Sequence, residues 1–230
     1  MFSKTRVAVL RGGPSSEYHV SLKTGATVLA NLPECYHPID VFIDLDGAWH
    51  CGGKKEKPHT ILGRVDVVWN ALHGDFGEDG AVQGLLESHG IRFSGTKRLG
   101  AVFSFNKFLA KQLMEKEGIK TPYALVFRHE DVPVPEVLAG ELYRTFPRPC
   151  IIKPVSKGSS IGISVAETPD EIAAALTAAF AISDRVLVEE YIAGREAVCG
   201  VIEQFRGEPH YSLLPVEVVI PEGHRFLSFE

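Results

Sequence analysis

A lysine that ends an apolar run and is followed by a loop of small residues is the feature of this chain best suited to chemistry. Lys153 closes the run that begins at Cys150, and the loop at 154–162 reads PVSKGSSIG. Glycines let a backbone approach phosphate oxygens, backbone N–H groups and hydroxyls donate to them, and lysine supplies positive charge. The spacing is not that of a Walker A loop, and a strand rather than a helix is predicted to follow. The sequence therefore predicts a nucleotide site of another architecture, built on a β-hairpin.

Two glycine-bearing loops nearer the N-terminus form a second candidate site. The loop at 12–21 (GGPSSEYHVS) carries Glu17, and the loop at 73–80 (HGDFGEDG) carries His73. Glu17 either complements the dipole of the helix predicted after it or presents its carboxylate to an ammonium group. The second loop combines an imidazole, acids and glycines, which favours a loop that faces substrate. No second histidine or cysteine stands at ligand spacing, so a zinc site is not predicted.

Two more segments could recognise a nucleotide. Lys107 falls within the helices predicted over 96–118, where a single lysine is usually solvated. The segment at 189–196 (EEYIAGRE) follows an apolar strand. A strand end and turn can offer backbone groups to an adenine edge, and a nearby carboxylate suits a ribose diol. Each segment alone also fits an ordinary helix or turn.

Alternating strands and helices must position these loops. Strands predicted within 6–10, 37–45, 66–72 and 90–94, with helices over 16–32 and 80–88, indicate an open parallel α/β sheet. In such sheets ligands bind beyond the carboxyl ends of the strands. The remainder reads as α+β: hairpin strands at 150–153 and 161–165, a helix opened by a capping box from Thr168 to Glu171, and strands at 185–192, 197–204 and 215–220. We expect domains at 1–95, 96–188 and 189–230.

The composition of the chain argues against several classes of function. The 230 residues carry a net charge of −5, so no broad basic footprint for nucleic acid is expected. No apolar run approaches the ~20 residues that span a bilayer, and the N-terminus has no secretory apolar region. The four cysteines are widely scattered, which is typical of reduced thiols. We therefore expect a cytoplasmic protein without a membrane partner.

Together these segments resemble the D-alanine–D-alanine ligases of the ATP-grasp superfamily. The resemblance rests on 12–21, 73–80, Lys107, 153–162 and 189–196, which occur in the family's order along essentially the whole chain. It implies a Rossmann-like, pre-ATP-grasp N-terminal sheet followed by an ATP-grasp domain. It also implies ATP-dependent joining of two D-alanines through an acyl phosphate, for peptidoglycan precursor synthesis, by a homodimer.

The resemblance also implies roles for single residues. Glu17 would hold the ammonium of the first D-alanine, with Ser159 hydrogen-bonded to Glu17, and His73 would lie near that substrate's carboxylate. The residues implied to bind ATP are Lys107, Lys153, Ser159, Ser160, Glu189, Tyr191, Ile192 and Glu196. The two lysines would neutralise phosphates, the serines would lie in the loop that closes over them, and Glu196 would bind ribose.

The sequence departs from the family pattern at its C-terminal end. The family continues for roughly another hundred residues, within the size of one further domain, and that part carries the ω-loop, a catalytic arginine and the Mg²⁺ ligands. The chain is thus expected to hold an incomplete ATP-grasp domain without ligands for the Mg²⁺ that the family uses. Three alternatives stay open: a ligase that joins D-alanine to a 2-hydroxy acid, a non-catalytic fragment that retains partial nucleotide binding, and a different, carboxylase-like ATP-grasp ligase.

Overall fold

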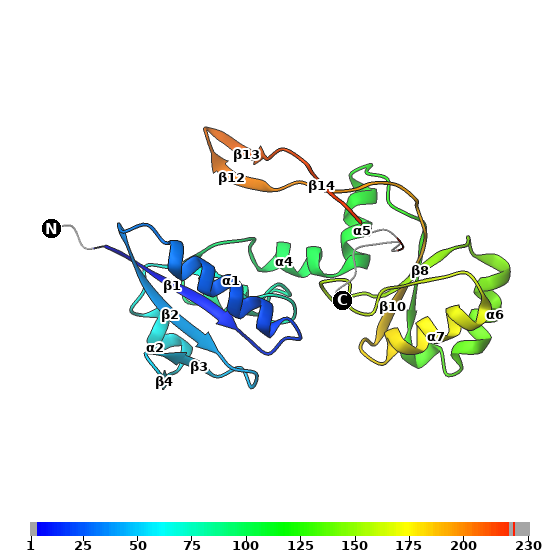
Figure 1. Cartoon of the computed structure of the whole chain (residues 1–230), viewed down its shortest axis with the longest axis horizontal. Coiled ribbons are helices and arrows are strands. Elements are labelled where there is room, and N and C mark those ends of the chain that lie inside the picture. Colours follow the sequence, from blue (N-terminus) through cyan, green and yellow to red (C-terminus); the bar gives the residue numbers. More distant parts are fainter. Residues whose placement is uncertain (1–3, 221–222, 224–230) are drawn as a thin grey trace. The chain divides into compact units, whose positions relative to one another are not determined.

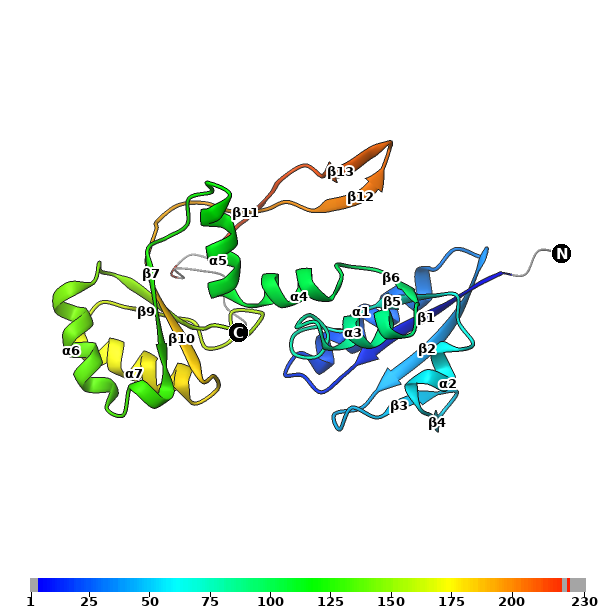
Figure 2. The same cartoon turned by 180° about the vertical axis from the view of Figure 1, so that it is seen from behind.

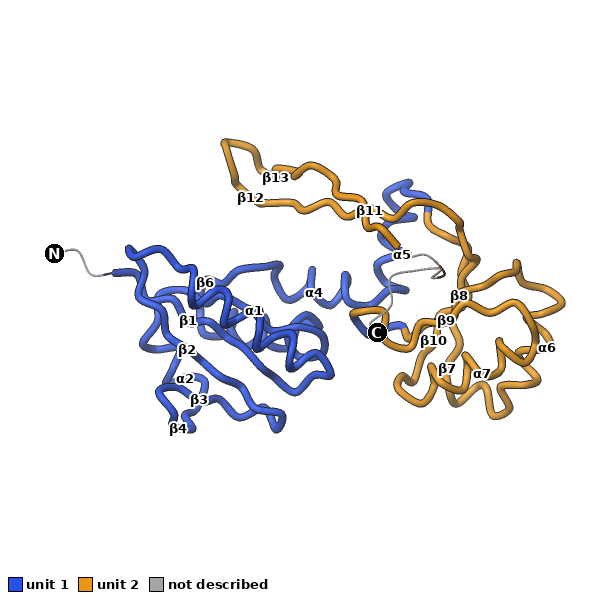
Figure 3. Tube along the Cα trace, viewed as in Figure 1, with its two compact units in different colours: residues 1–120, 155–158 blue, residues 121–154, 159–230 orange. Residues whose placement is uncertain are grey.

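The chain folds into two compact units. The computed structural model describes residues 4–220 and 223, and all structural statements refer to these. Unit 1 comprises residues up to Lys120 together with Val155–Gly158, and unit 2 comprises Thr121–Pro154 and the residues from Ser159 onward (Figure 3). The short segment 155–158 therefore packs with unit 1, although the chain on either side of it belongs to unit 2. The domain boundaries expected at 95 and 188 stay a prediction.

Unit 1 is built on a six-stranded sheet in the order β4-β3-β2-β1-β5-β6. Its strands are β1 (Thr5–Gly12), β2 (Tyr36–Ile43), β3 (Trp49–Cys51), β4 (Lys54–Lys55), β5 (Val67–Asn70) and β6 (Arg92–Phe93). The four strands β2, β1, β5 and β6 run parallel, which confirms the predicted parallel α/β sheet. The strands β3 and β4 extend the sheet in antiparallel fashion, a feature that the sequence analysis did not predict.

Helices cover both faces of this sheet because alternate residues of β1 are buried on opposite sides. Val7 and Val9 pack with Val28 and Leu29 of α1 (Tyr18–Asn31), whose ribbon lies along β1 in Figure 1. Ala8 and Leu10 belong to the larger core, which also holds side chains of α2 (Pro58–Leu62) and α3 (Ala81–Ser88). Figure 2 shows the unit from behind, with α3 near β5. Two further helices, α4 (Arg98–Phe105) and α5 (Lys107–Lys116), complete the unit.

Unit 2 contains an antiparallel sheet in the order β7-β10-β8-β9. The strands are β7 (Ala124–Arg128), β8 (Cys150–Pro154), β9 (Ser164–Ala166) and β10 (Arg185–Glu190). The predicted hairpin is the pair β8–β9, in which Ile151 lies opposite Val165. The sequence analysis predicted no strand at β7, which pairs with β10 over Ala124 to Arg128.

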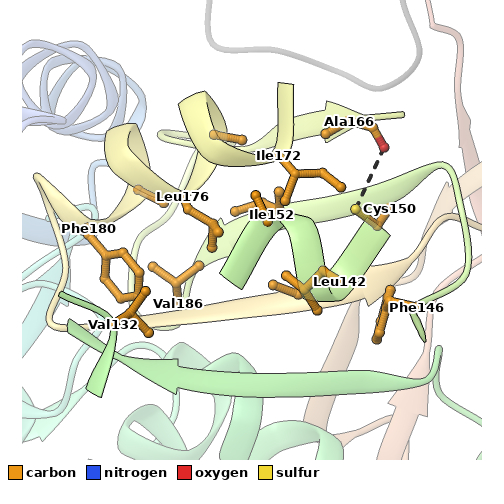
Figure 4. Close-up of a cluster of buried hydrophobic side chains, with 14 residues drawn as sticks. Val132, Leu142, Phe146, Cys150, Ile152, Ala166, Ile172, Leu176, Phe180 and Val186 are labelled. Atoms are coloured by element: carbon orange, nitrogen blue, oxygen red, sulfur yellow. Dashed lines mark hydrogen bonds between the residues drawn. The ribbon is translucent and has the colours of Figure 1, made fainter. Parts of the chain in front are cut away.

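One face of this sheet is covered by α6 (Pro135–Thr145) and α7 (Pro169–Phe180), which pack against each other. A one-turn 3-10 helix, η1 (His129–Asp131), follows β7. Figure 4 shows Ile152 and Val186 of the sheet against Ile172 and Leu176 of α7. The predicted capping box opens α7: Thr168 accepts from the Glu171 backbone N–H, and the Glu171 carboxylate accepts from the Thr168 N–H.

The C-terminal part of unit 2 forms two separate strand pairs. These are β11 (Glu196–Val198) with β14 (Val216–Val218), and β12 (Val201–Phe205) with β13 (Glu208–Ser212). The single strand predicted over 197–204 is therefore wrong: it is broken at Cys199 and Gly200, where the Gly200 carbonyl accepts from the Leu213 N–H at 2.8 Å instead. All four cysteines are free thiols. Among the described residues, no helix is both long and apolar enough to cross a membrane.

Candidate active site

The two glycine-bearing loops of unit 1 leave adjacent parallel strands at the same edge of the sheet. Leu10 of β1 lies opposite Asn70 of β5, and the Ala71 N–H donates to the Leu10 carbonyl at 3.0 Å. Buried Ser21 ties the two loops together, because its hydroxyl accepts from the Gly12 N–H at 2.9 Å and donates to the Ala71 carbonyl at 2.8 Å. The loops therefore meet at the carboxyl ends of the strands, where ligands of such sheets bind.

Glu17 lies at the start of α1 with only 5% of its surface exposed. Its backbone N–H donates to the Ser15 hydroxyl at 3.1 Å. Two glycines border its carboxylate closely: a Cβ atom added to Gly74 would lie 2.5 Å from Glu17 Oε2, and one added to Gly158 would lie 2.8 Å from the same atom. Because neither position has room for a side chain, the carboxylate is held between the second loop and segment 155–158.

His73 is held in a fixed orientation by contacts at both ring nitrogens. Its Nε2 lies 2.8 Å from the Thr24 hydroxyl on α1, and its Nδ1 lies 3.5 Å from Glu78 Oε1. Glu78 also anchors the loop itself, because its other carboxylate oxygen accepts from the Gly74 N–H at 3.1 Å. The imidazole is thus a rigid part of the same loop pair that holds Glu17.

Lys107 is the first residue of α5, where a positive charge opposes the helix dipole. Residues that are unfavourable for the local structure are expected at functional sites. A lysine beside the N–H groups of a helix N-terminus can bind an anion. Its backbone N–H donates to the Val155 carbonyl at 2.9 Å, and its ammonium donates to the Lys157 carbonyl at 2.5 Å. Asn106 caps the helix by accepting from the Leu109 N–H. Lys107 is therefore fixed to the segment predicted to bind phosphate.

In unit 2, Lys153 and Glu189 form an ion pair between the neighbouring strands β8 and β10. Lys153 lies opposite Leu187, two residues from Glu189, so the two charged side chains share a sheet face. Ile152 and Val188 point to the other face, into the core beneath α6 and α7. The pair is largely buried, with 18% of the Lys153 and 6% of the Glu189 side chain exposed. A lysine placed this way needs a negative partner, which Glu189 supplies.

The loop after β8 has an unusual backbone. Ser159 and Ser160 both have positive φ, 48° and 57°, a region that residues with side chains seldom adopt. Such conformations are concentrated at ligand-binding and catalytic sites. Gly162, at φ 72°, ends the turn, and a Cβ there would meet Ile182 and Pro154 within 3 Å.

The segment predicted to bind adenine and ribose follows the end of β10. The Tyr191 N–H donates to the Pro149 carbonyl at 3.2 Å, which fixes the chain just after the strand. Ile192 is exposed, and Glu196 lies exposed on β11, opposite Val218. Unit 2 therefore carries Lys153, Ser159, Ser160, Glu189, Tyr191, Ile192 and Glu196, whereas unit 1 carries Glu17, His73 and Lys107.

No group of three or more His, Cys, Asp or Glu side chains that could hold a metal ion is present among residues 4–220 and 223.

Three positioning residues were not singled out from the sequence. Ser15, Ser21 and Thr24 contact the backbone of Glu17, the two loops and His73, respectively. Ser21 and Thr24 lie one and two turns into α1, on the side that faces the second loop. Ser21 and Thr24 could have been recognised from the sequence, because they are polar residues on a helix face that is otherwise apolar.

Comparison with known proteins identifies the family of this chain. The family model for the D-ala D-ala ligase N-terminus matches residues 6–61 and 53–96, and the model for the D-ala D-ala ligase C-terminus matches residues 113–230. The D-alanine--D-alanine ligase of Geobacter sulfurreducens is 38% identical over 86% of this chain, and that of Solibacter usitatus is 36% identical over 99%. The chain spans 58% and 67% of their lengths, respectively.

Solved structures show the same fold. The D-alanine-D-alanine ligase from Coxiella burnetii has a TM-score of 0.80 at 26% identity, covering 94% of this chain and 71% of that one. The VanG D-Ala:D-Ser ligase from Enterococcus faecalis has a TM-score of 0.82 at 27% identity, covering 99% and 73%. Because the two family models together match most of its residues, the chain belongs to the D-alanine–D-alanine ligase family.

Proposed function

We propose that this chain carries the amino-acid-binding and much of the nucleotide-binding part of a D-alanine–D-alanine ligase. The observation that carries the proposal is the buried Glu17 carboxylate at the start of α1, enclosed by the Gly74 loop and by Gly158 of the predicted phosphate loop. A buried carboxylate beside a phosphate-binding loop suits a substrate with an ammonium group next to the group that is phosphorylated. An α-amino acid is such a substrate.

The proposed reaction has two steps. The carboxylate of the first D-alanine attacks the γ-phosphorus of ATP, ADP leaves, and an acyl phosphate forms. The amino group of the second D-alanine then attacks the acyl carbon, phosphate leaves, and D-alanyl-D-alanine results. Both steps depend mainly on positioning and on offsetting negative charge.

The chain's own residues would meet these needs as follows. Glu17 would hold the first ammonium, with Ser159 hydrogen-bonded to Glu17, and rigid His73 would lie near the first carboxylate. Lys107 and Lys153 would offset the charge of the phosphates. The Ser159–Ser160 turn would cover the phosphates and shield the acyl phosphate from water.

The remaining nucleotide contacts would come from the end of β10. Glu189, Tyr191 and Ile192 would border adenine, and Glu196 would bind the ribose hydroxyls. The family reaction also uses Mg²⁺, which offsets phosphate charge when bound. We further propose a homodimer in the cytoplasm, where ATP and peptidoglycan precursors meet.

The second substrate is a separate question, because one structural neighbour is named as a D-Ala:D-Ser ligase. Acceptors should therefore be compared directly: D-alanine, D-serine and D-lactate, each with D-alanine as the first substrate. Product masses identify the acceptor.

The test of the proposed function is binding and turnover by the 230-residue chain. We expect D-alanine to bind more tightly than L-alanine, and Glu17→Gln to weaken D-alanine binding about tenfold or more while ATP binding is retained, as for the loss of a hydrogen bond to a charged group. Equal binding of D-alanine by wild type and Glu17→Gln would overturn the assignment. ATP binding with no response to D-alanine would favour the non-catalytic or carboxylase-like alternatives. Phosphate release that depends on D-alanine would exclude a non-catalytic fragment.

A further inference from the structure

The segment Val155–Gly158 is attached to unit 1 by a small set of polar contacts. The Lys107 N–H and ammonium donate to the carbonyls of Val155 and Lys157, at 2.9 and 2.5 Å. The Lys157 ammonium in turn lies 2.5 Å from Asp75 Oδ2. Asp75 and Lys157 are 82 positions apart, so their ion pair joins the predicted phosphate loop to the loop that carries His73.

Within the 73–80 loop, all of which the structure describes, the Asp75 carboxylate makes no hydrogen bond. That loop is held by its neighbours: Glu78 accepts from the Gly74 N–H, Asp79 accepts from the Phe76 N–H, and Gln83 donates to the Gly77 carbonyl. The Asp75 carboxylate interacts instead with Lys157. Asp75 therefore stabilises the position of segment 155–158 rather than the conformation of the 73–80 loop.

Segment 155–158 has two functional neighbours. Gly158 borders the Glu17 carboxylate, and the Lys157 carbonyl accepts from the Lys107 ammonium. A shift of the segment would therefore move the wall beside Glu17 and release the acceptor that orients Lys107. Both side chains of the Asp75–Lys157 pair are partly exposed, at 36% and 26%, so the pair is of moderate strength and is weakened by salt.

We propose that Asp75 is a positioning residue for the ligase reaction. Through Lys157 it holds segment 155–158 against unit 1 and so orders the wall of the amino-acid site and the Lys107 ammonium before the substrates bind. This inference rests on the proposed function for its catalytic consequence, but the ordering of the loop is a property of the chain alone. Because Asp75 acts through Lys157, its loss should raise the dissociation constants for D-alanine and ATP.

The first test measures the loop without substrates. Hydrogen exchange of peptides covering 153–163 is compared for wild type, Asp75→Asn, the charge-swapped double variant Asp75→Lys with Lys157→Asp, and Asp46→Asn, which makes the same change at an exposed turn. We expect exchange to be about three to ten times faster in Asp75→Asn, from the loss of a partly exposed ion pair. The charge-swapped and Asp46→Asn variants should exchange at the wild-type rate. Unchanged exchange in Asp75→Asn, or no recovery in the charge-swapped variant, would overturn the proposal.

The second test connects the loop to the substrates. Dissociation constants for D-alanine and for ATP should rise about three- to tenfold in Asp75→Asn and recover in the charge-swapped variant. At 0.5 M NaCl the ion pair is largely screened, so the difference between Asp75→Asn and wild type should be smaller. Faster exchange with wild-type affinities would refute the positioning role. If the wild-type chain binds neither substrate, the proposed function fails, and the exchange experiment still decides whether Asp75 orders the loop. Circular dichroism confirms that each variant is folded.

Discussion

Replacing Gly158 by alanine should displace the Glu17 carboxylate without disturbing the rest of the fold. The added methyl would lie 2.8 Å from Glu17 Oε2, about 0.6 Å short of the 3.4 Å at which ordinary contacts begin. Glu17 cannot withdraw freely, because Gly74 closely borders the same carboxylate oxygen. Unlike Gly74, Gly158 does not have positive φ, so the substitution introduces a steric clash but little backbone strain.

The expected cost follows from this geometry. Overpacking a tight site by one methyl costs about 1–3 kcal/mol, and here the displaced group is the one proposed to bind the substrate ammonium. A loss of about 1–2 kcal/mol corresponds to about a 5- to 30-fold weaker affinity for D-alanine. Isothermal titration of D-alanine measures this, and urea denaturation reports any change in the free energy of unfolding.

Gly140→Ala provides the matched control. Gly140 lies within α6 of unit 2, and a Cβ there would have its nearest neighbour, Arg144 Nη1, at 3.7 Å. This variant should bind D-alanine as wild type does, with a small gain in stability because alanine favours helix. If Gly158→Ala binds D-alanine within twofold of wild type, the reasoning about the wall of the Glu17 site is refuted.

Three further predictions follow from single contacts. Lys107→Ala should weaken ATP binding about tenfold or more in calorimetry, because a charge-assisted contact to phosphate is lost; unchanged affinity would remove Lys107 from the nucleotide site. Thr168→Ala should lower the free energy of unfolding by about 1 kcal/mol in urea, since the Glu171 N–H loses its acceptor; a change below about 0.3 kcal/mol would contradict the capping role. The Arg6 contacts lower the pKa of Asp66 to about 2, so the stabilisation they provide is complete above the unfolded pKa of about 3.9 and is lost as the pH falls toward 2. Asp66→Asn should therefore lose stability relative to wild type at pH 6 and differ much less at pH 2, as thermal melts will show; an equal difference at both pH values would refute this.

The sequence predicted the features that depend on local pattern. Short apolar runs and helical spacing placed β1, α1, β5 and α3 within a few residues, and the Thr168–Glu171 pair predicted the start of α7. The paired loops could also be placed at one sheet edge, because parallel strands of a sheet share their carboxyl ends.

Features that depend on distant pairing were missed. The strand β7 is an edge strand whose apolar residues run together without alternation, and only its pairing with β10 defines it. The contacts of Thr24 with His73 and of Lys157 with Asp75 join residues 49 and 82 positions apart. No local pattern signals which distant residue each of these side chains contacts.

The central claim is that Glu17 binds the substrate ammonium while Lys107 and Lys153 bind the phosphates of the same reaction. A crystal structure of the chain with D-alanine and a non-hydrolysable ATP analogue tests it most directly. The account predicts the D-alanine ammonium within hydrogen-bond distance of the Glu17 carboxylate and both lysine ammonium groups on phosphate oxygens. An amino acid bound away from Glu17, or phosphates that neither lysine contacts, would contradict it.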